Sequence, residues 1–143
     1  MNTDFMKKAI ETAKLSGNDI PVGVVIVKNG KIIATACNER EKLQKTTAHA
    51  EILAIEKANE VFNNWRLNDC DLYVTLEPCP MCASAIIQSR IKNVYFGSYD
   101  LLNGAFGSKF DIKKYCDSNI NIKGGILEEE CTNLLKKYFK EIR

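Results

Sequence analysis

The sequence has no long apolar run. Its apolar runs, such as residues 24–27, are far shorter than the roughly 20 residues that a helix needs to cross a membrane. Charged residues also interrupt the first twenty positions, which excludes the apolar core of a secretory signal from them. We therefore expect a cytoplasmic protein with no membrane-spanning segment.

A strong net charge and linker segments are also missing. The chain of 143 residues carries 20 Lys and Arg against 18 Asp and Glu, and a net charge of +2 is too small to indicate nucleic-acid binding by itself. A basic cluster on one face could still contact phosphates. No repeat, low-complexity tract or Pro/Gly/Ser-rich stretch divides the sequence. We therefore predict a single domain over residues 1–143, long enough to bury a core.

The six cysteines are interpreted as reduced thiols and not as a disulfide framework, because we expect a cytoplasmic location. Two of them, Cys79 and Cys82, form a C-x-x-C motif. The other four have no ligand-like spacing, and we expect them to be packing residues. They are Cys37, Cys70, Cys116 and Cys131.

Apolar periodicity predicts a succession of helices and strands. Residues 3–15 place apolar side chains at helical spacing, and Asn29-Gly30 between two β-branched runs is a strong two-residue hairpin signal. The strand–helix–strand alternation that follows predicts a partly parallel sheet with helices on its faces, which the hairpin makes mixed. The predicted helices are residues 3–15, 48–61, 79–89 and 127–142, and the predicted strands are residues 22–27, 31–36, 72–76, 94–96 and 120–122.

Two short motifs carry residues that can bind a metal: His49-Ala50-Glu51 and, further along, Pro78-Cys79-Pro80-Met81-Cys82. One imidazole and two thiols can fill three positions of a tetrahedral zinc site and leave the fourth open for water. Both motifs lie at predicted helix starts, where unpaired N–H groups favour thiolate over thiol. This pairing of H-x-E with P-C-x-x-C is the described signature of zinc deaminases. The sequence thus predicts one zinc ion held by His49, Cys79 and Cys82, with Glu51 as the catalytic proton shuttle.

Each part of this signature also has a simpler interpretation. A C-x-x-C motif in a cytoplasmic α/β chain can be a redox pair, and a structural zinc module would use the same thiols. A single histidine is by default a hydrogen-bonded structural group, and Glu51 is by default a solvated helix residue. The joint occurrence of all four residues favours a hydrolase, because neither alternative needs a free carboxylate or an open fourth position.

Longer stretches resemble a known family over nearly the whole chain. Four of them resemble the cytidine deaminase superfamily: Pro21-Val22-Gly23, residues 47–52, residues 75–83 and Phe96-Gly97. Four others resemble more narrowly the bacterial tRNA-specific adenosine deaminases: Asp100, residues 104–108, Leu134-Leu135 and Tyr138-Phe139. This resemblance implies a three-layer α/β/α fold with a central mixed five-stranded sheet, and a homodimer. The implied reaction is the hydrolytic conversion of adenosine to inosine at the wobble position of a tRNA anticodon stem-loop.

The resemblance also implies which residues bind substrate. Asn38 matches the asparagine that holds the extruded base, the backbone of Ala50 would help to read the base edge, and Val22 would line the pocket wall. Simpler interpretations are a turn residue for Asn38 and core packing for the aromatic pair of the last helix. The remaining implied contacts, all from regions that meet the RNA, are Asp100, Tyr138 and Phe139.

The sequence departs from the family pattern near the expected pocket. Lys45-Thr46 stand where an Asp-Pro pair is usual, and Val24 stands where alanine is usual. Neither departure removes a residue that the chemistry needs. The nearest alternative function is that of a superfamily enzyme acting on a free base or nucleoside, such as guanine deaminase, because the zinc motif is shared.

Overall fold

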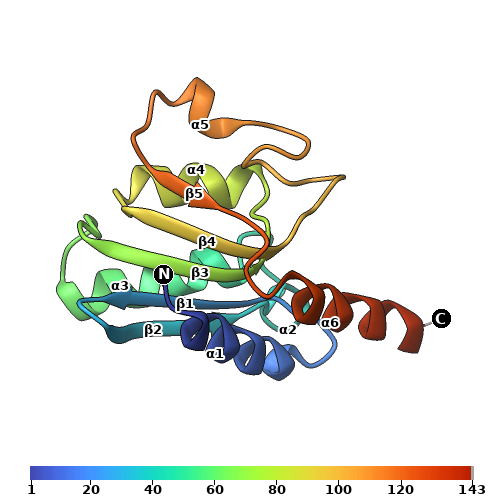
Figure 1. Cartoon of the computed structure of the whole chain (residues 1–143). Coiled ribbons are helices and arrows are strands. Elements are labelled where there is room, and N and C mark those ends of the chain that lie inside the picture. The colour runs from blue at the N-terminus through green and yellow to red at the C-terminus, as the bar shows by residue number, and fades with distance from the viewer. Residues whose placement is uncertain (143) are drawn as a thin grey trace.

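A five-stranded mixed sheet runs through the centre of the molecule, as the computed structural model of residues 1–142 shows (Figure 1). The strands lie in the order β2-β1-β3-β4-β5. Strand β1 is antiparallel to β2 and β3, whereas β3, β4 and β5 are parallel to one another. The predicted mixed five-stranded sheet is confirmed. The strands are β1 Gly23–Lys28, β2 Lys31–Cys37, β3 Cys70–Leu76, β4 Asn93–Ser98 and β5 Asn121–Lys123.

The β1–β2 connection is the two-residue turn that Asn29-Gly30 predicted. Both residues have positive φ, 53° for Asn29 and 75° for Gly30. A type I′ turn requires positive φ at both central positions, and its twist matches that of the strands it joins. The turn therefore fixes the register of the hairpin, in which Lys28 pairs with Lys31.

Helices cover both faces of the sheet and give three layers (Figure 1). Side chains alternate along β1: Val24 and Ile26 belong to the core under α3 and α4, while Val25 and Val27 belong to the core under α1 and α6. All four are buried, so β1 contributes side chains to both cores. The predicted three-layer α/β/α fold is confirmed. The long helices are α1 Thr3–Ala13, α3 Ala50–Phe62, α4 Pro80–Gln88 and α6 Glu128–Glu141.

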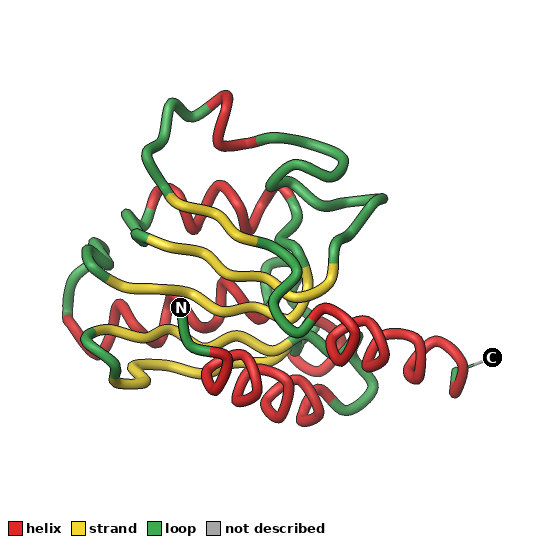
Figure 2. The backbone as a smooth tube through the Cα atoms, viewed as in Figure 1, coloured by secondary structure: helices red, strands yellow, loops and turns green. Residues whose placement is uncertain are grey.

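Two single-turn helices were not predicted, α2 Arg40–Leu43 and α5 Ile112–Tyr115 (Figure 2). The predicted helix of residues 3–15 ends in a 3-10 turn, η1 Lys14–Ser16. One turn is too short to show a helical period in the sequence. Helix α2 depends on a distant residue, because the buried carboxylate of Asp19 accepts hydrogen bonds from the N–H groups of Glu41 and Lys42. Among residues 1–142 no helix combines the length and apolar character needed to span a membrane.

Helix α1 approaches β1 so closely that only glycine fits at position 23. A Cβ atom on Gly23 would lie 1.9 Å from the carbonyl oxygen of Ala9 and 2.6 Å from the amide nitrogen of Ala13. We expect Gly23→Ala to lower the free energy of unfolding by about 3 kcal/mol or more, since both neighbours are backbone atoms that cannot rotate away. Urea denaturation measures this change. A loss below about 1 kcal/mol would mean that α1 moves off the sheet at little cost.

Candidate metal centre and substrate pocket

The candidate site lies along one edge of the sheet, where β2, β3 and β4 end and β1 begins. This edge follows from the strand directions, and in sheets with parallel strands such carboxyl ends are common places for ligands. Four short segments meet there: Val22 precedes β1, Asn38 follows β2, residues 77–79 follow β3, and Asp100 follows β4. Residues far apart in sequence are thus brought to one place.

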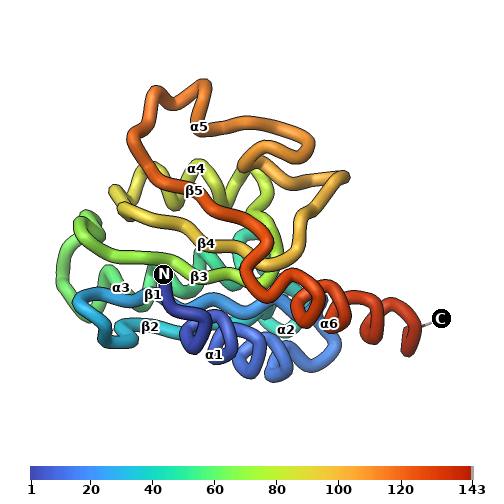
Figure 3. Tube along the Cα trace, in the orientation of Figure 1, coloured from blue at the N-terminus to red at the C-terminus, as the bar shows by residue number. Residues whose placement is uncertain are grey.

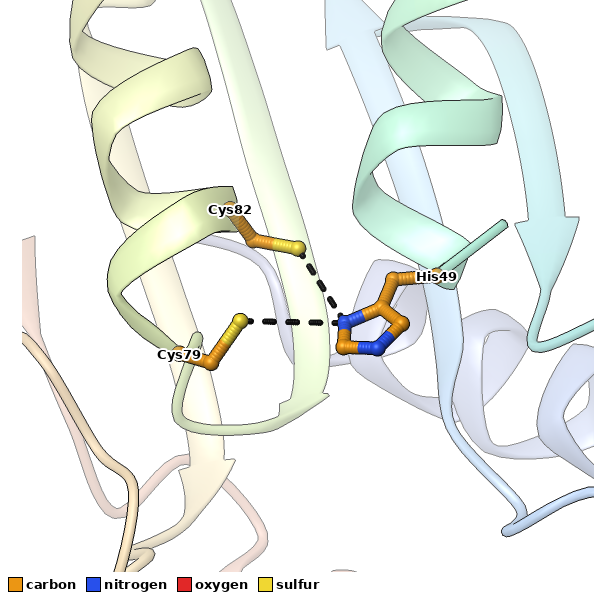
Figure 4. Close-up of side chains that lie close together, drawn as sticks. All are labelled: His49, Cys79 and Cys82. Atoms are coloured by element: carbon orange, nitrogen blue, oxygen red, sulfur yellow. Dashed lines mark hydrogen bonds between the residues drawn. The ribbon is translucent and has the colours of Figure 1, made fainter. Parts of the chain in front are cut away.

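His49, Cys79 and Cys82 converge at this edge (Figure 4). The Nδ1 atom of His49 lies 3.7 Å from the Sγ atom of Cys79 and 3.5 Å from that of Cys82. In a tetrahedral site with Zn–N of about 2.05 Å and Zn–S of about 2.3 Å, nitrogen and sulfur ligands are about 3.6 Å apart. The donor set and its spacing therefore fit a zinc ion with three protein ligands.

Two helix starts hold these ligands. His49 is the N-cap residue of α3 and Cys79 is the N-cap residue of α4, and both have extended backbone with ψ of 150° and 172°. Pro80 occupies the first turn of α4, where its missing N–H costs no hydrogen bond. The positive ends of both helix dipoles point toward the site and favour thiolate. The predicted placement of both motifs at helix starts is confirmed.

The two thiols differ in their readiness to ionise. A hydrogen bond from Cys82 lowers the pKa of Cys79 to about 4, against the opposing effect of its burial. The same hydrogen bond raises the pKa of Cys82, and burial adds to this effect. The hydrogen bond with Cys79 also raises the pKa of His49. Cys79 is thus the thiol of the pair that ionises more readily.

Glu51 is a buried carboxyl group beside the ligand set. It lies in the first turn of α3, it is only 4% exposed, and it lines the same pocket as His49 and Cys79. Burial raises its pKa to about 7. A group with such a pKa can both accept and donate a proton near neutral pH, as acid–base chemistry requires. The simpler interpretation of Glu51 as a solvated helix residue does not match this burial.

A pocket of about 450 Å³ opens onto these residues. This volume lies within the range of small-molecule sites. The amide side chain of Asn38 bridges the pocket wall: its Oδ1 accepts from the N–H of Ala50 at 2.8 Å, and its Nδ2 donates to the carbonyl of Ile20 at 3.0 Å. Asn38 lines the pocket and Ala50 does not, and the N–H of Ala50 is already bonded to Asn38. Among the other residues predicted to bind substrate, those that line the pocket are Val22, Asp100 and Tyr138.

Of the aromatic pair of α6, Tyr138 and Phe139, only the first residue lines the pocket. Tyr138 lines it, and its hydroxyl donates to the carbonyl of Asn18 at 2.9 Å. This bond joins α6 to the segment that follows α1, and the two helices lie next to each other although they are the first and last of the chain (Figure 3). Phe139 packs edge-on against Tyr138, with 5.2 Å between the ring centroids, and does not line the pocket. Direct contact of Phe139 with a substrate remains a prediction.

Comparison with known proteins identifies the family. Residues 1–98 match the family described as "Cytidine and deoxycytidylate deaminase zinc-binding region", and they include His49, Glu51, Cys79 and Cys82. The chain belongs to this deaminase family.

Relatives of the deaminase match over nearly its whole length. It is 43% identical to the tRNA-specific adenosine deaminase of Bacillus subtilis, across 97% of this chain and 89% of the relative. It also resembles a solved structure from studies of A-to-I editing by tRNA:A34 deaminases at the wobble position of transfer RNA. That match has a TM-score of 0.87 at 37% identity and covers 94% of this chain and all of the other. A guanine deaminase structure from B. subtilis matches with a TM-score of 0.68 at 39% identity, over 81% of this chain and 76% of that one.

Several pocket residues of the deaminase were not predicted as site residues. Arg40 and Glu41 reach the pocket on helix α2, and Asn103 reaches it on the loop after β4. Glu77 also lines the pocket although it is only 2% exposed. One signal was available for Glu77, because an acidic residue between a buried strand and a Pro-Cys pair is unusual for a residue type that is mostly exposed.

Proposed function

We propose that this deaminase converts adenosine to inosine at the wobble position of a tRNA anticodon, with release of ammonia. The observation that carries the proposal is 43% identity to a tRNA-specific adenosine deaminase over 97% of this chain. The site supports the same chemistry, because His49 and Cys79 of the ligand set and the buried carboxyl group of Glu51 line one pocket. A redox pair would have no use for Glu51.

His49, Cys79 and Cys82 would hold one zinc ion per chain. When bound, zinc supplies a Lewis acid that lowers the pKa of water to about 7. Glu51 takes one proton from the attacking water and delivers it to the ring nitrogen. It then takes the second proton from the hydroxyl now on the ring carbon and delivers it to the departing amine, which leaves a carbonyl. One carboxyl group with a pKa near 7 can perform both pairs of transfers. Water is consumed and ammonia leaves, so the atoms of the reaction balance.

The other pocket residues hold the base and its neighbours. Asn38 binds the base edge and Val22 forms the wall. Ala50 supports this contact from behind, because its N–H donates to Oδ1 of Asn38. The target base must leave its stack to enter the pocket, and this costs least in an exposed loop such as an anticodon loop. Asp100 and the pair Tyr138 and Phe139 contact the flanking RNA. Basic residues near the pocket and on α6 complement the phosphates: Arg40, Lys42, Lys45, Lys136, Lys137 and Lys140.

Three further parts of the proposal rest on the family resemblance and on the thiols. We place the reaction in the cytoplasm, because none of the six cysteines forms a disulfide and a reducing compartment keeps thiols in this state. We treat residues 1–143 as one deaminase domain. We also expect a homodimer, for which light scattering would give twice the mass of one chain.

The test is inosine formation in an anticodon stem-loop with adenosine at the wobble position, incubated with zinc-loaded protein and measured by nucleoside mass spectrometry. The same stem-loop with guanosine at that position is the control. Inosine from the first RNA alone supports the proposal. No inosine from a zinc-replete sample would contradict it. The match to guanine deaminase makes ammonia release from free guanine the next assay.

A further inference from the structure

Glu77 has a buried carboxylate that the proposed reaction does not use. It follows β3 directly, two residues before Cys79, and is 2% exposed. One oxygen, Oε2, accepts from the N–H groups of Phe106 and Ser108, at 3.1 Å each. The other, Oε1, accepts from the N–H of Asp100 at 3.2 Å and from the hydroxyl of Ser108. All four donors belong to residues 99–108, the start of the loop between β4 and α5 (Figure 2).

These hydrogen bonds are what satisfies the carboxylate. Within residues 1–142, no Lys, Arg or His lies at ion-pair distance from Glu77. A buried carboxylate with neither an ion-pair partner nor hydrogen-bond donors is strongly unfavourable. Hydrogen bonds to an ionised group are among the stronger hydrogen bonds. Loop conformations that move the donors away would leave this group unsatisfied. Glu77 therefore selects one conformation of the 99–108 loop.

The loop is built to fit around this carboxylate. A Cβ atom on Gly104 would lie 2.4 Å from Cδ of Glu77 and 2.4 Å from the carbonyl oxygen of Asp100. Glycine is needed at position 104 because the loop backbone passes directly over the side chain. The N–H of Ala105 also donates to the carbonyl of Pro78 at 2.8 Å, which ties the loop to the segment that carries Cys79.

The same loop forms part of the pocket rim. Asp100 and Asn103 both line the pocket. Oδ1 of Asp100 accepts from the N–H groups of Leu102 and Asn103, each at 3.1 Å, so the position of Asp100 sets that of Asn103. Two sets of hydrogen bonds thus link Glu77 to the rim. The carboxylate of Glu77 binds the backbone of Asp100, and the side chain of Asp100 binds the backbone of Asn103.

We infer that Glu77 is a positioning residue that sets substrate affinity. Its carboxylate holds the 99–108 loop so that Asp100 and Asn103 form a fixed rim for the nucleotides beside the target base. The inference rests on the proposed function, because it assigns the rim to an RNA substrate. Glu77 acts through the loop and takes no part in proton transfer, so its loss should affect binding more than turnover.

The test is Glu77→Gln in the zinc-loaded full chain. We expect KM for the stem-loop to rise about 10- to 100-fold, because a displaced rim weakens binding. We expect kcat to change by less than about threefold and zinc to remain at one per chain. Gly104→Ala should give the same KM effect from the loop side, and Ser108→Ala a smaller one, because it removes a single donor. Glu56→Gln is the matched control, because Glu56 is an exposed residue of α3 that does not line the substrate pocket.

Each other outcome contradicts the inference. A lower kcat at unchanged KM would place Glu77 in the chemical step, and loss of zinc would mean that it acts through Cys79. Unchanged kinetics would mean that the loop does not need Glu77.

Hydrogen exchange tests the inference independently of the proposed function. In Glu77→Gln the amides of Asp100, Phe106 and Ser108 should exchange at least about tenfold faster. Unchanged exchange would overturn the inference even if the wild-type protein made no inosine.

Discussion

Glu51→Gln should lower kcat for inosine formation by at least about 10³-fold while the protein keeps its zinc. The amide has the shape of the carboxyl group but cannot accept a proton from water or return one to the leaving amine. Zinc retention is expected because Glu51 is not one of the three residues at ligand spacing. The measurement combines single-turnover inosine formation with zinc content by mass spectrometry.

Glu56→Gln is again the matched control, because Glu56 lies on the same helix and is exposed. It should retain wild-type activity. If Glu51→Gln kept more than about a tenth of the wild-type rate, another group would be moving the protons, since general acid–base groups contribute at least about 10²-fold. Loss of zinc from this variant would instead show that Glu51 supports the ligands.

Cys82→Ser should lose both bound metal and stability. Cys82 is fully buried, and its Sγ atom lies 3.5 Å from Nδ1 of His49. Substituting a residue that only supports a ligand weakens metal binding roughly 10- to 100-fold. Removing one of three protein ligands should weaken zinc binding by more than that. Bound zinc at about 1,000 times its Kd contributes about 4 kcal/mol to the free energy of unfolding, and the variant forfeits most of this.

Cys116→Ser is the control for this variant, because Cys116 is an exposed thiol outside the ligand set. Zinc content and thermal unfolding, each measured with and without added zinc, should leave Cys116→Ser indistinguishable from the wild type. A Cys82→Ser protein with a full complement of zinc would remove Cys82 from the ligand set and would weaken the case for a three-ligand site.

The residues that the sequence predicted correctly are those whose signal is local. Asn29-Gly30 sets its own turn, and the long helices and strands show their period within a few residues. The metal-binding motifs are equally local, because each is one short segment at a helix start. The spacing within these motifs shows what they can bind before any fold is known.

The residues that sequence reasoning missed depend on contacts between distant segments. Glu77 binds donors 23 to 31 residues further along the chain. Helix α2 forms where the N–H groups of Glu41 and Lys42 meet Asp19, 22 and 23 residues earlier. Neither pairing leaves a period or a spacing in the sequence. They emerge only once the sheet has brought the strand ends to one edge.

The residues of the pocket are divided between two parts of the chain. The region that matches the deaminase family ends at residue 98 and contains His49, Glu51 and the two thiols. Asp100, Asn103 and Tyr138, which form part of the rim, all lie beyond it. The pocket is thus assembled from both parts of the chain. Substitutions at these three positions change the border of the pocket while the ligands and Glu51 stay as they are.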